Sequence, residues 1–285
     1  MQEMVKDDEK SYRVSYLGPE ATFTHEAALR FFSGQGTITF KPEIDIISIF
    51  KSVENDEAMY GIVPIENALE GTVNITLDLL IESTVLVVGE IYLPIDIHLL
   101  SKSSNLENIK KVLSHPHAIA QCRNWFRENA PEIDFQEVSS TSLAAKYTSE
   151  DPSLGALSSA IAAEVYGLNI VVEKLDTSES NSTRFFVIGK RAKQTDKESK
   201  TSFLFVLKNQ PGALYRFLKP IAERKLNLTK IESRPSKRQA WDYVFFVDVE
   251  GHSEDPVLVE TINELKNEVS FFRILGSYPK DIFSG

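Results

Sequence analysis

Asn181-Ser182-Thr183-Arg184-Phe185-Phe186 marks the place where a polar segment runs into an apolar strand. Upstream of it, strands alternate with helices. Downstream, a charged segment leads into a unit with a different pattern. The run brings an amide, two hydroxyls and a guanidinium to the mouth of the first unit. These groups suit a small ligand that carries carboxylates.

Composition narrows the class of protein. A chain of 285 residues is long enough for two domains, and 42% apolar residues are ordinary for a globular protein. The net charge of -10 argues against nucleic acid as a partner, so local donors must hold an anionic ligand. The charged start MQEMVKDDEK and the absence of a long apolar run predict a cytoplasmic protein without a membrane partner.

The region from Tyr12 to Lys190 alternates between strand-like and helical patterns. Strands separated by helices indicate βαβ units and a mostly parallel sheet, hence an α/β fold. The predicted strands are 13–17, 37–40, 60–64, 85–93, 95–100, 112–114, 134–138, 154–157, 170–175 and 184–188, and the predicted helices are 26–32, 45–53, 74–81, 118–129, 142–148 and 160–166.

So many strands are unusual for one open sheet, and we expect residues 12–190 to form two lobes, as in periplasmic binding proteins. The chain would cross between the lobes near residues 93–97 and again near residues 170–183. Such a body binds its ligand in the cleft outside the carboxyl ends of the strands.

A second unit is predicted for residues 201–280. Residues 191–200, RAKQTDKESK, contain no large apolar side chain and indicate a solvated linker. The pattern that follows is strand, helix, strand, strand, helix, strand, which is the ferredoxin-like βαββαβ unit. A small unit with one open sheet face or edge tends to pair, so dimerisation is expected here.

Several strand-to-helix junctions of the first unit carry hydroxyls or glycine. Each hydroxyl can simply cap a helix. Together, helix N-termini gathered around one cleft would make an anion site from neutral donors. Both interpretations stay open for the junctions at 18–24, 66–72, 139–142 and 157–159.

Three residues are candidates for chemistry. Thr183 and Arg184 are neighbours on one strand and therefore point to opposite faces unless the backbone kinks. Thr183 is the better candidate for direct contact with a substrate, whereas Arg184 either clamps a carboxylate or joins the lobes through an internal ion pair. Glu66 follows an apolar strand, and it either acts as a general acid or pairs with Arg184.

Metal and nucleotide sites are not favoured. His115-Pro116-His117 offers two ligands without a third, so histidines of a loop, one of them bonding a ligand, are the better interpretation. Cys122 lies in an amphipathic helical pattern and is expected to be a buried thiol. Gly34-Gln35-Gly36 precedes a strand and is no phosphate loop, and no dinucleotide pattern occurs. We expect no metal and no cofactor.

The second unit has two notable segments. Gln210-Pro211-Gly212 lies between a strand and a helix, where glycine lets a small ligand approach backbone N–H groups. Glu232-Ser233-Arg234-Pro235 ends a strand. It is either a plain turn or part of an amino-acid site, in which Glu232 would meet the ammonium group and backbone amides the carboxylate.

These motifs resemble the prephenate dehydratase family, including its C-terminal ACT domain, across nearly the whole chain. The matching residues are Leu17-Gly18-Pro19 with Thr22-Phe23, Pro64-Ile65-Glu66-Asn67 with Gly71, His115-Pro116 with Gln121-Cys122, Ser140-Thr141 with Ala144-Ala145, Asn181 with Thr183-Arg184-Phe185, Gly212-Ala213-Leu214, and Glu232-Ser233-Arg234-Pro235.

The resemblance implies conversion of prephenate to phenylpyruvate, water and carbon dioxide, a step toward L-phenylalanine, without metal or cofactor. It also implies control by phenylalanine bound between paired ACT domains, in a dimer or tetramer. The residues before Tyr12 leave little room for a chorismate mutase domain, so the monofunctional form is expected. Three positions depart from the usual family pattern, namely Ala21, Ala68 and His117.

The resemblance also suggests roles for single residues. Thr183 would hydrogen-bond the leaving hydroxyl, with Glu66 or water as the proton source and Arg184 as a third catalytic group. Ser140 and Thr141 would hold the side-chain carboxylate. Further substrate contacts are expected from Asn67, Thr22, Asn181, Phe185 and His115, and phenylalanine contacts from Gly212, Ala213, Leu214, Glu232, Ser233 and Arg234.

Three rival functions share parts of this pattern. Arogenate dehydratase has the same motifs and differs in whether the side chain of the substrate bears an amine or a ketone. A solute-binding protein has the same two-lobe architecture, but the missing signal sequence and the appended unit argue against it. A catalytically silent phenylalanine sensor is the third, and Thr183-Arg184-Phe185 argues against it.

Overall fold

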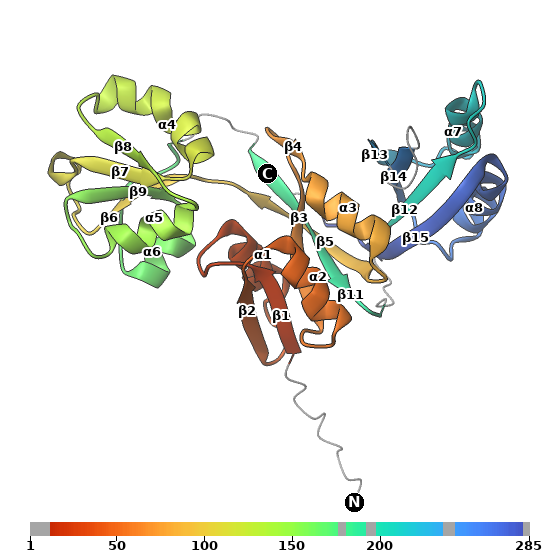
Figure 1. Cartoon of the computed structure of the whole chain (residues 1–285), viewed down its shortest axis with the longest axis horizontal. Helices are drawn as coiled ribbons and strands as arrows, with labels where there is room; N and C mark the ends of the chain where they lie inside the picture. Colours follow the sequence, from red (N-terminus) through yellow and green to blue (C-terminus); the bar gives the residue numbers. More distant parts are fainter. Residues whose placement is uncertain (1–11, 176–180, 192–197, 236–242, 282–285) are drawn as a thin grey trace, which may run out of the picture.

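The computed structural model describes residues 12–175, 181–191, 198–235 and 243–281. Residues 176–180, in the predicted second crossover, and 192–197, in the predicted linker, lie outside the described residues. Figure 1 shows three bodies: a central lobe, a second lobe joined to it by two passages of the chain, and a C-terminal domain on the opposite side.

The first lobe is built on a sheet with the strand order β2-β1-β3-β11-β5. Strands β2, β1 and β3 are parallel, and β11 runs antiparallel to both of its neighbours. The sheet is therefore mixed. Its antiparallel strand, β11, is the one that follows the second lobe in the chain. The strands are β1 (Tyr12–Leu17), β2 (Ile38–Glu43), β3 (Tyr60–Asn67), β5 (Leu86–Pro94) and β11 (Ser182–Gly189), with the short β4 (Gly71–Thr72) paired to β3.

Helices cover both faces of this sheet. Ala27 and Ala28 of α1 pack with Val14, Tyr16 and Phe185 on one face. On the other face, apolar side chains of α2 and α3 pack against β3 and β11. The three helices are α1 (Phe23–Phe31), α2 (Ile46–Glu54) and α3 (Asn74–Glu82).

The second lobe is an insertion between β5 and β11. Its sheet has the order β10-β6-β9-β7-β8, with β8, β7 and β9 parallel and β6 antiparallel to both neighbours. The chain enters it between Pro94 and His98 and leaves it between Val172 and Ser182. The elements are β6 (His98–Ser101), η1 (Leu106–Asn108), β7 (Lys111–Ser114), α4 (Pro116–Asn129), β8 (Asp134–Glu137), α5 (Thr141–Thr148), β9 (Leu154–Ser158), α6 (Ala160–Tyr166) and β10 (Asn169–Val172).

The C-terminal domain has the predicted βαββαβ order. Its sheet, β13-β14-β12-β15, is antiparallel throughout, and two helices cover one face around Phe203, Phe217 and Leu265. The elements are β12 (Ser199–Leu207), α7 (Ala213–Glu223), β13 (Leu228–Pro235), β14 (Tyr243–Glu250), α8 (Pro256–Glu268) and β15 (Val269–Pro279).

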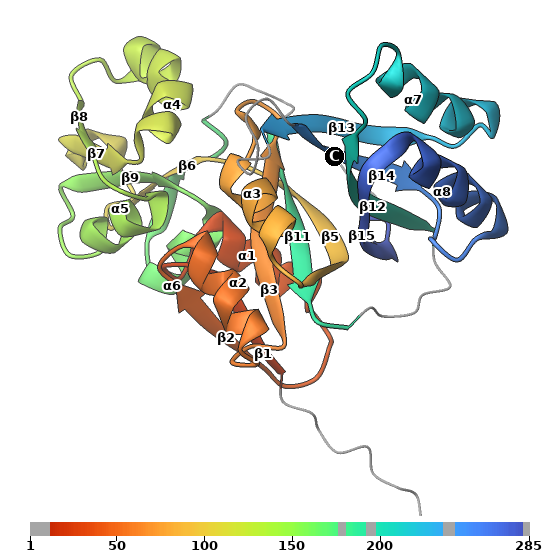
Figure 2. The ribbon, with the colours of Figure 1, turned by 45° about the vertical axis from the view of Figure 1, so that its right-hand side comes forward.

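The other face of this C-terminal sheet packs on the first lobe, as the turned view in Figure 2 shows. Leu204, Phe246 and Tyr278 share one apolar core with Val87 and Phe186. At the closest approach, a Cβ added to Gly276 would lie 2.0 Å from the carbonyl oxygen of Val87, so only glycine fits there. The sheet face available for dimerisation in an isolated domain is therefore used inside the chain, and β13 and β15 form the sheet edges.

Within the described part of the chain, no helix is both long and apolar enough to cross a membrane.

Candidate active site

Asn67 and Thr183 face each other at one end of the first sheet. They are paired residues on β3 and β11, and the Nδ2 of Asn67 donates to the Oγ1 of Thr183 over 2.9 Å. Asn67 ends its strand and Thr183 lies at the start of the next, so both side chains lie where the chain passes toward the second lobe. We call Asn67, Thr183, Asn181 and Gln121 the interlobe site.

The orientation of the Asn67 amide is set by its own loop. Its Oδ1 accepts the backbone N–H groups of Leu69 at 2.8 Å and Glu70 at 3.0 Å. Its Nδ2 must therefore point the other way, toward the oxygens of Asn181 and Thr183. Since the Thr183 oxygen accepts from Asn67, the Thr183 O–H proton is directed to a different acceptor. The geometry makes Thr183 a hydrogen-bond donor.

Two side-chain contacts connect this site to the second lobe. The Nδ2 of Asn181 lies 3.5 Å from the Oε1 of Gln121 on α4. The Nδ1 of His117 lies 2.5 Å from Glu70 Oε1 in the turn between β3 and β4. His115 caps α4, because its ring nitrogen accepts the backbone N–H of His117. The interlobe site is thus closed by residues from both lobes.

The loop after β1 makes a second bridge. Ser142 and Ser159 of the second lobe donate to the backbone oxygens of Glu20 and Ala21. Ala21 is fully buried in the core of the second lobe and has a φ of 62°, the left-handed region that favours glycine. Its position explains how this departure from the family pattern is accommodated: the methyl group fills part of that core.

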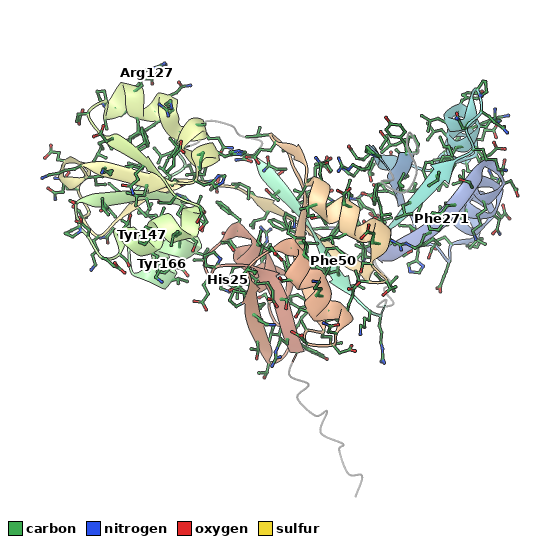
Figure 3. All side chains as sticks on the ribbon, in the orientation of Figure 1. His25, Phe50, Arg127, Tyr147, Tyr166 and Phe271 are labelled. Atoms are coloured by element: carbon green, nitrogen blue, oxygen red, sulfur yellow. The ribbon has the colours of Figure 1, made fainter. Side chains whose placement is uncertain are left out.

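Next to this loop, His25 receives the N–H of Ala21 on its Nδ1 and stacks on Tyr16 at 4.5 Å. Burial lowers the pKa of His25 below its usual value, so the neutral ring carries its proton on Nε2. Figure 3 labels His25 on α1 and Tyr166 on α6, and the Tyr166 hydroxyl lies 3.2 Å from Ser142 Oγ. Ser142 is the residue that contacts Glu20 across the lobes.

Helix caps account for the predicted hydroxyls. Thr22 accepts the N–H of His25, and Ser140 accepts that of Leu143 at 3.0 Å, so the capping interpretation is confirmed for both. Thr141 begins α5. Thr22 follows β1 and Ser140 follows β8, at the strand ends where the lobes meet. The groups available to an anion there are the N-termini of helices rather than cationic side chains. Among the described residues, no group of three or more His, Cys, Asp or Glu side chains could hold a metal ion.

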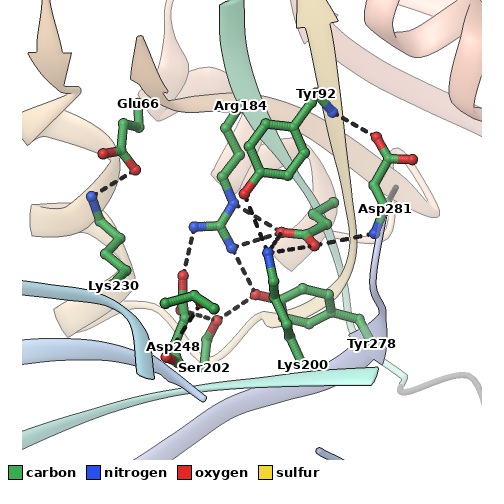
Figure 4. A network of polar contacts seen from close by, with 11 residues as sticks. Glu66, Tyr92, Arg184, Lys200, Ser202, Lys230, Asp248, Tyr278 and Asp281 are labelled. Atoms are coloured by element: carbon green, nitrogen blue, oxygen red, sulfur yellow. Dashed lines mark hydrogen bonds and ion pairs between the residues drawn. The ribbon is translucent and has the colours of Figure 1, made fainter. Parts of the chain in front are cut away.

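Arg184 does not clamp a substrate carboxylate. The alternative prediction of an internal ion pair is confirmed, but the pair joins the first lobe to the C-terminal domain rather than to the second lobe. Arg184 faces away from Thr183 and is 4% exposed, enclosed between the first lobe and the C-terminal domain. Figure 4 shows its guanidinium beside the carboxylate of Asp248, with NH1 2.5 Å from Asp248 Oδ2. On the other side, Nε lies 2.9 Å from Glu90 Oε2. The physical reason is strand alternation, which puts Arg184 on the opposite face from Thr183.

Further polar groups complete this buried network. Lys200 Nζ lies 2.9 Å from Glu90 Oε1, and the Tyr278 hydroxyl contacts both Arg184 and Ser202. Burial by itself lowers the pKa of Arg184, but Asp248, Tyr278 and Glu90 raise it well above its usual value. Burial raises the pKa of Tyr278 well above its usual range, so this hydroxyl stays protonated.

Glu66 has a different partner from the one that was predicted. Its Oε2 lies 2.8 Å from Nζ of Lys230 in the C-terminal domain, so the expected pairing with Arg184 is wrong, although the two residues are opposite each other on β3 and β11. Glu66 and Asn67 alternate along β3, and the carboxylate therefore lies on the face away from Thr183. This placement contradicts a general-acid role for Glu66 beside Thr183.

Phe185 and Cys122 are core residues. Phe185 is 2% exposed and packs with Val187 and Ile62, which corrects the expectation of a substrate contact. Cys122 is a buried thiol in the core of the second lobe, as predicted.

The predicted effector residues fall into two groups. Gly212 precedes α7 with a φ of 75°, followed by the buried Ala213 and the more exposed Leu214. On β13, Glu232 and Arg234 face the first lobe, where Glu232 accepts from Thr72 and Arg234 pairs with Asp78. The expectation that the Glu232 carboxylate is available for an ammonium group is therefore corrected. Ser233, on the alternate face, is exposed.

Several residues of these sites were missed from the sequence. Gln121 stands four residues after His117, on the same face of a helix, and this spacing could have pointed to it. Ser142 lies in the hydroxyl-bearing junction at 139–142, but its partner Glu20 could not be predicted because it is remote in sequence. For the same reason the contacts of Glu70 and Lys230 could not be predicted.

The geometry agrees with comparisons to known proteins. The family model for prephenate dehydratase matches residues 14–193, and that for the ACT domain matches residues 201–267. The chain belongs to the prephenate dehydratase family. The resemblance drawn from its motifs is therefore confirmed, and the family is one of enzymes, the hydro-lyases.

A similar relative is the bifunctional chorismate mutase/prephenate dehydratase of Aquifex aeolicus, which is 50% identical over 95% of this chain and 75% of the relative. Among solved structures, the prephenate dehydratase of Arthrobacter aurescens in complex with L-Phe is 31% identical, with a TM-score of 0.83 over 94% of this chain and 90% of that one. GqqA, described as a novel type of quorum quenching acylase, is 29% identical, with a TM-score of 0.85 over 96% of this chain and 100% of that one.

Proposed function

We propose that this protein is a prephenate dehydratase, which converts prephenate to phenylpyruvate, water and carbon dioxide at the interlobe site. The observation that carries the proposal is the Asn67–Thr183 hydrogen bond. The loop around Asn67 orients the amide, the amide occupies the acceptor side of the Thr183 hydroxyl, and the hydroxyl proton is left to serve a ligand between the lobes.

Prephenate carries a ring carboxylate and, on the opposite ring carbon, a hydroxyl. When the bond to the carboxylate carbon breaks, its electron pair enters the ring and carbon dioxide leaves. The C–O bond on the opposite carbon then breaks, and the departing oxygen takes up a proton to become water. The ring becomes aromatic, so the enzyme needs only to assist these departures.

Thr183 would donate its hydroxyl proton in a hydrogen bond to the departing oxygen, where negative charge develops. A preorganised donor of this kind stabilises the transition state more than the ground state. Glu66 lies on the other face of the sheet, so a water molecule becomes the proposed source of the final proton.

Neutral donors would hold the two carboxylates of the substrate. Arg184 is enclosed elsewhere, and the N-termini of α1, α4 and α5 lie where the lobes meet, behind Thr22, His115 and Ser140. Backbone N–H groups at such ends favour anions. We propose Ser140 and Thr141 for the side-chain carboxylate, with Thr22, His115 and Asn181 lining the rest of the site.

Replacing Asn67 by aspartate should separate the role of the amide from its shape. The carboxylate can still accept the N–H groups of Leu69 and Glu70, but it would accept the Thr183 proton instead of donating to the oxygen. We expect kcat to fall about 100-fold. Steady-state kinetics check this, with Asn263→Asp, an exposed change of equal charge on α8, as control. Equal rates for the two variants would refute the orientation argument.

The direct test is turnover. Purified protein is mixed with prephenate, and phenylpyruvate is followed by its absorbance in alkali; arogenate is supplied in parallel, with release of phenylalanine as its readout. Turnover of prephenate supports the proposal, and faster turnover of arogenate assigns the chain to the rival dehydratase. No turnover of either substrate would overturn it, and an acylase assay would then follow from the structural likeness to GqqA.

We further propose that residues 12–190 form the catalytic body and that residues 201–280 form a regulatory domain for L-phenylalanine, joined by residues 191–200. The effector would contact the start of α7 at Gly212, Ala213 and Leu214 in one copy and the exposed side of β13 around Ser233 in another. This arrangement requires at least a dimer. Titration with L-phenylalanine should change kcat or KM and raise the thermal midpoint; no change in any of them would exclude the effector.

A further inference from the structure

β13 holds the first lobe through three alternate side chains, which we call the β13 comb: Lys230, Glu232 and Arg234. Lys230 Nζ lies 2.8 Å from Glu66 Oε2 and 3.4 Å from Thr72 Oγ1, and that hydroxyl lies 3.2 Å from Glu232 Oε2. The intervening residues of β13 point to the other face and are exposed.

Lys230 and Glu232 of the β13 comb contact the hairpin formed by β3 and β4. Glu66 is paired with Thr72 across this hairpin, and the next pair is Asn67 with Gly71. Lys230 therefore contacts both strands one residue away from the amide that orients Thr183. The turn between the strands also carries Glu70, which contacts His117 of the second lobe.

Arg234 acts elsewhere. Its NH2 lies 3.1 and 3.2 Å from the two carboxylate oxygens of Asp78 on α3. Arg234 therefore contacts a helix rather than the hairpin.

Lys230 is an enclosed residue of the interface between the domains rather than a surface lysine. Its side chain is only 9% exposed, although that of Glu66 is 39% exposed. An ammonium group so enclosed needs its partner, because removing one member of an enclosed pair leaves the other without compensation. Glu66 and Thr72 are thereby held in one arrangement, and the hairpin with them.

Building on the proposed function, we propose that Lys230 is a positioning residue for the reaction. Through Glu66 it holds the β3–β4 hairpin, and through the hairpin it holds the Asn67 amide against Thr183. Lys230 touches no substrate. The rate of the chemical step then depends on the position of the C-terminal domain, because the residue that holds the hairpin belongs to that domain.

Lys230→Met tests the proposal. We expect kcat to fall about tenfold, about 1.4 kcal/mol in the barrier, with KM little changed. Lys230→Arg should keep most of the rate because it retains the cation. The matched control is Arg273→Met, which also removes a cation between the domains, but one that bonds the carbonyl oxygens of Ser83 and Leu80 at the end of α3. Its kcat should stay near that of the parent.

A double-mutant cycle with Glu66→Gln separates positioning from direct acid catalysis. If Lys230 acts through Glu66, both single variants lose about the same rate and the double variant loses no more. Equal losses in Lys230→Met and Arg273→Met, or additive losses in the cycle, would overturn the proposal.

Hydrogen exchange decides the case where prephenate is not turned over and the proposed function itself fails. The N–H groups of Leu69 and Glu70 donate to Asn67 and report on the hairpin directly. They should exchange faster in Lys230→Met than in the parent or in Arg273→Met. Unchanged exchange in Lys230→Met would show that the comb does not hold the hairpin.

Discussion

Thr183→Ala is expected to lower kcat by about 10²–10³-fold while the fold is retained, because the variant lacks the donor aimed at the departing oxygen. The Asn67 amide would lose one acceptor and keep Asn181 as the other, so the loop around it should stay in place. Steady-state kinetics with prephenate measure the effect, and circular dichroism verifies the fold.

Thr183→Ser is the matched control, since it keeps the hydroxyl and loses only a methyl group. It should retain most of the rate. A kcat for Thr183→Ala within about threefold of the parent, less than about 0.7 kcal/mol in the barrier, would remove Thr183 from the chemistry.

Arg184→Met is expected to destabilise the protein by about 3–5 kcal/mol, because it leaves the carboxylates of Glu90 and Asp248 enclosed with too little positive charge. Lys200 can neutralise one of them, whereas Asp248 then keeps the Ser202 hydroxyl as its partner among the described residues. The midpoint of guanidinium chloride unfolding, followed by circular dichroism, measures the loss.

The control for this prediction is Arg216→Met. Arg216 pairs with Glu268 inside the C-terminal domain, with side chains 40% and 32% exposed, so its loss should cost no more than about 1 kcal/mol. Equal shifts of the unfolding midpoint for the two variants would show that the enclosed network adds no more stability than a surface pair.

Local patterns in the sequence were sufficient for the fold class. Apolar periodicity identified strands and helices in both units, and the order strand, helix, strand, strand, helix, strand predicted the C-terminal domain. What periodicity could not predict is the place of β11 between β3 and β5, which makes the first sheet mixed. Strand order depends on pairing between remote segments, and a single sequence contains no local record of it.

The candidate site was predicted in part. Strand alternation correctly separated Thr183 from Arg184, and the capping roles of Thr22 and Ser140 followed from residue type. The partners of Arg184 and Glu66 did not, because Asp248 is 64 residues from Arg184 and Lys230 is 164 residues from Glu66. Both belong to the C-terminal domain, so the assignments failed where two domains share one network.

Ala21 has a consequence for how the molecule folds. Residues 98–172 have their own sheet and are inserted between β5 and β11, which are neighbours in the first sheet, as an independently folding insertion would be. Yet the core around Leu100, Ala144 and Ala156 is completed by a methyl group from a loop that is synthesised long before the insertion. Excised alone, that segment would lack this methyl group and have a gap in that core. We therefore expect the two lobes to unfold together in denaturant, as one cooperative unit.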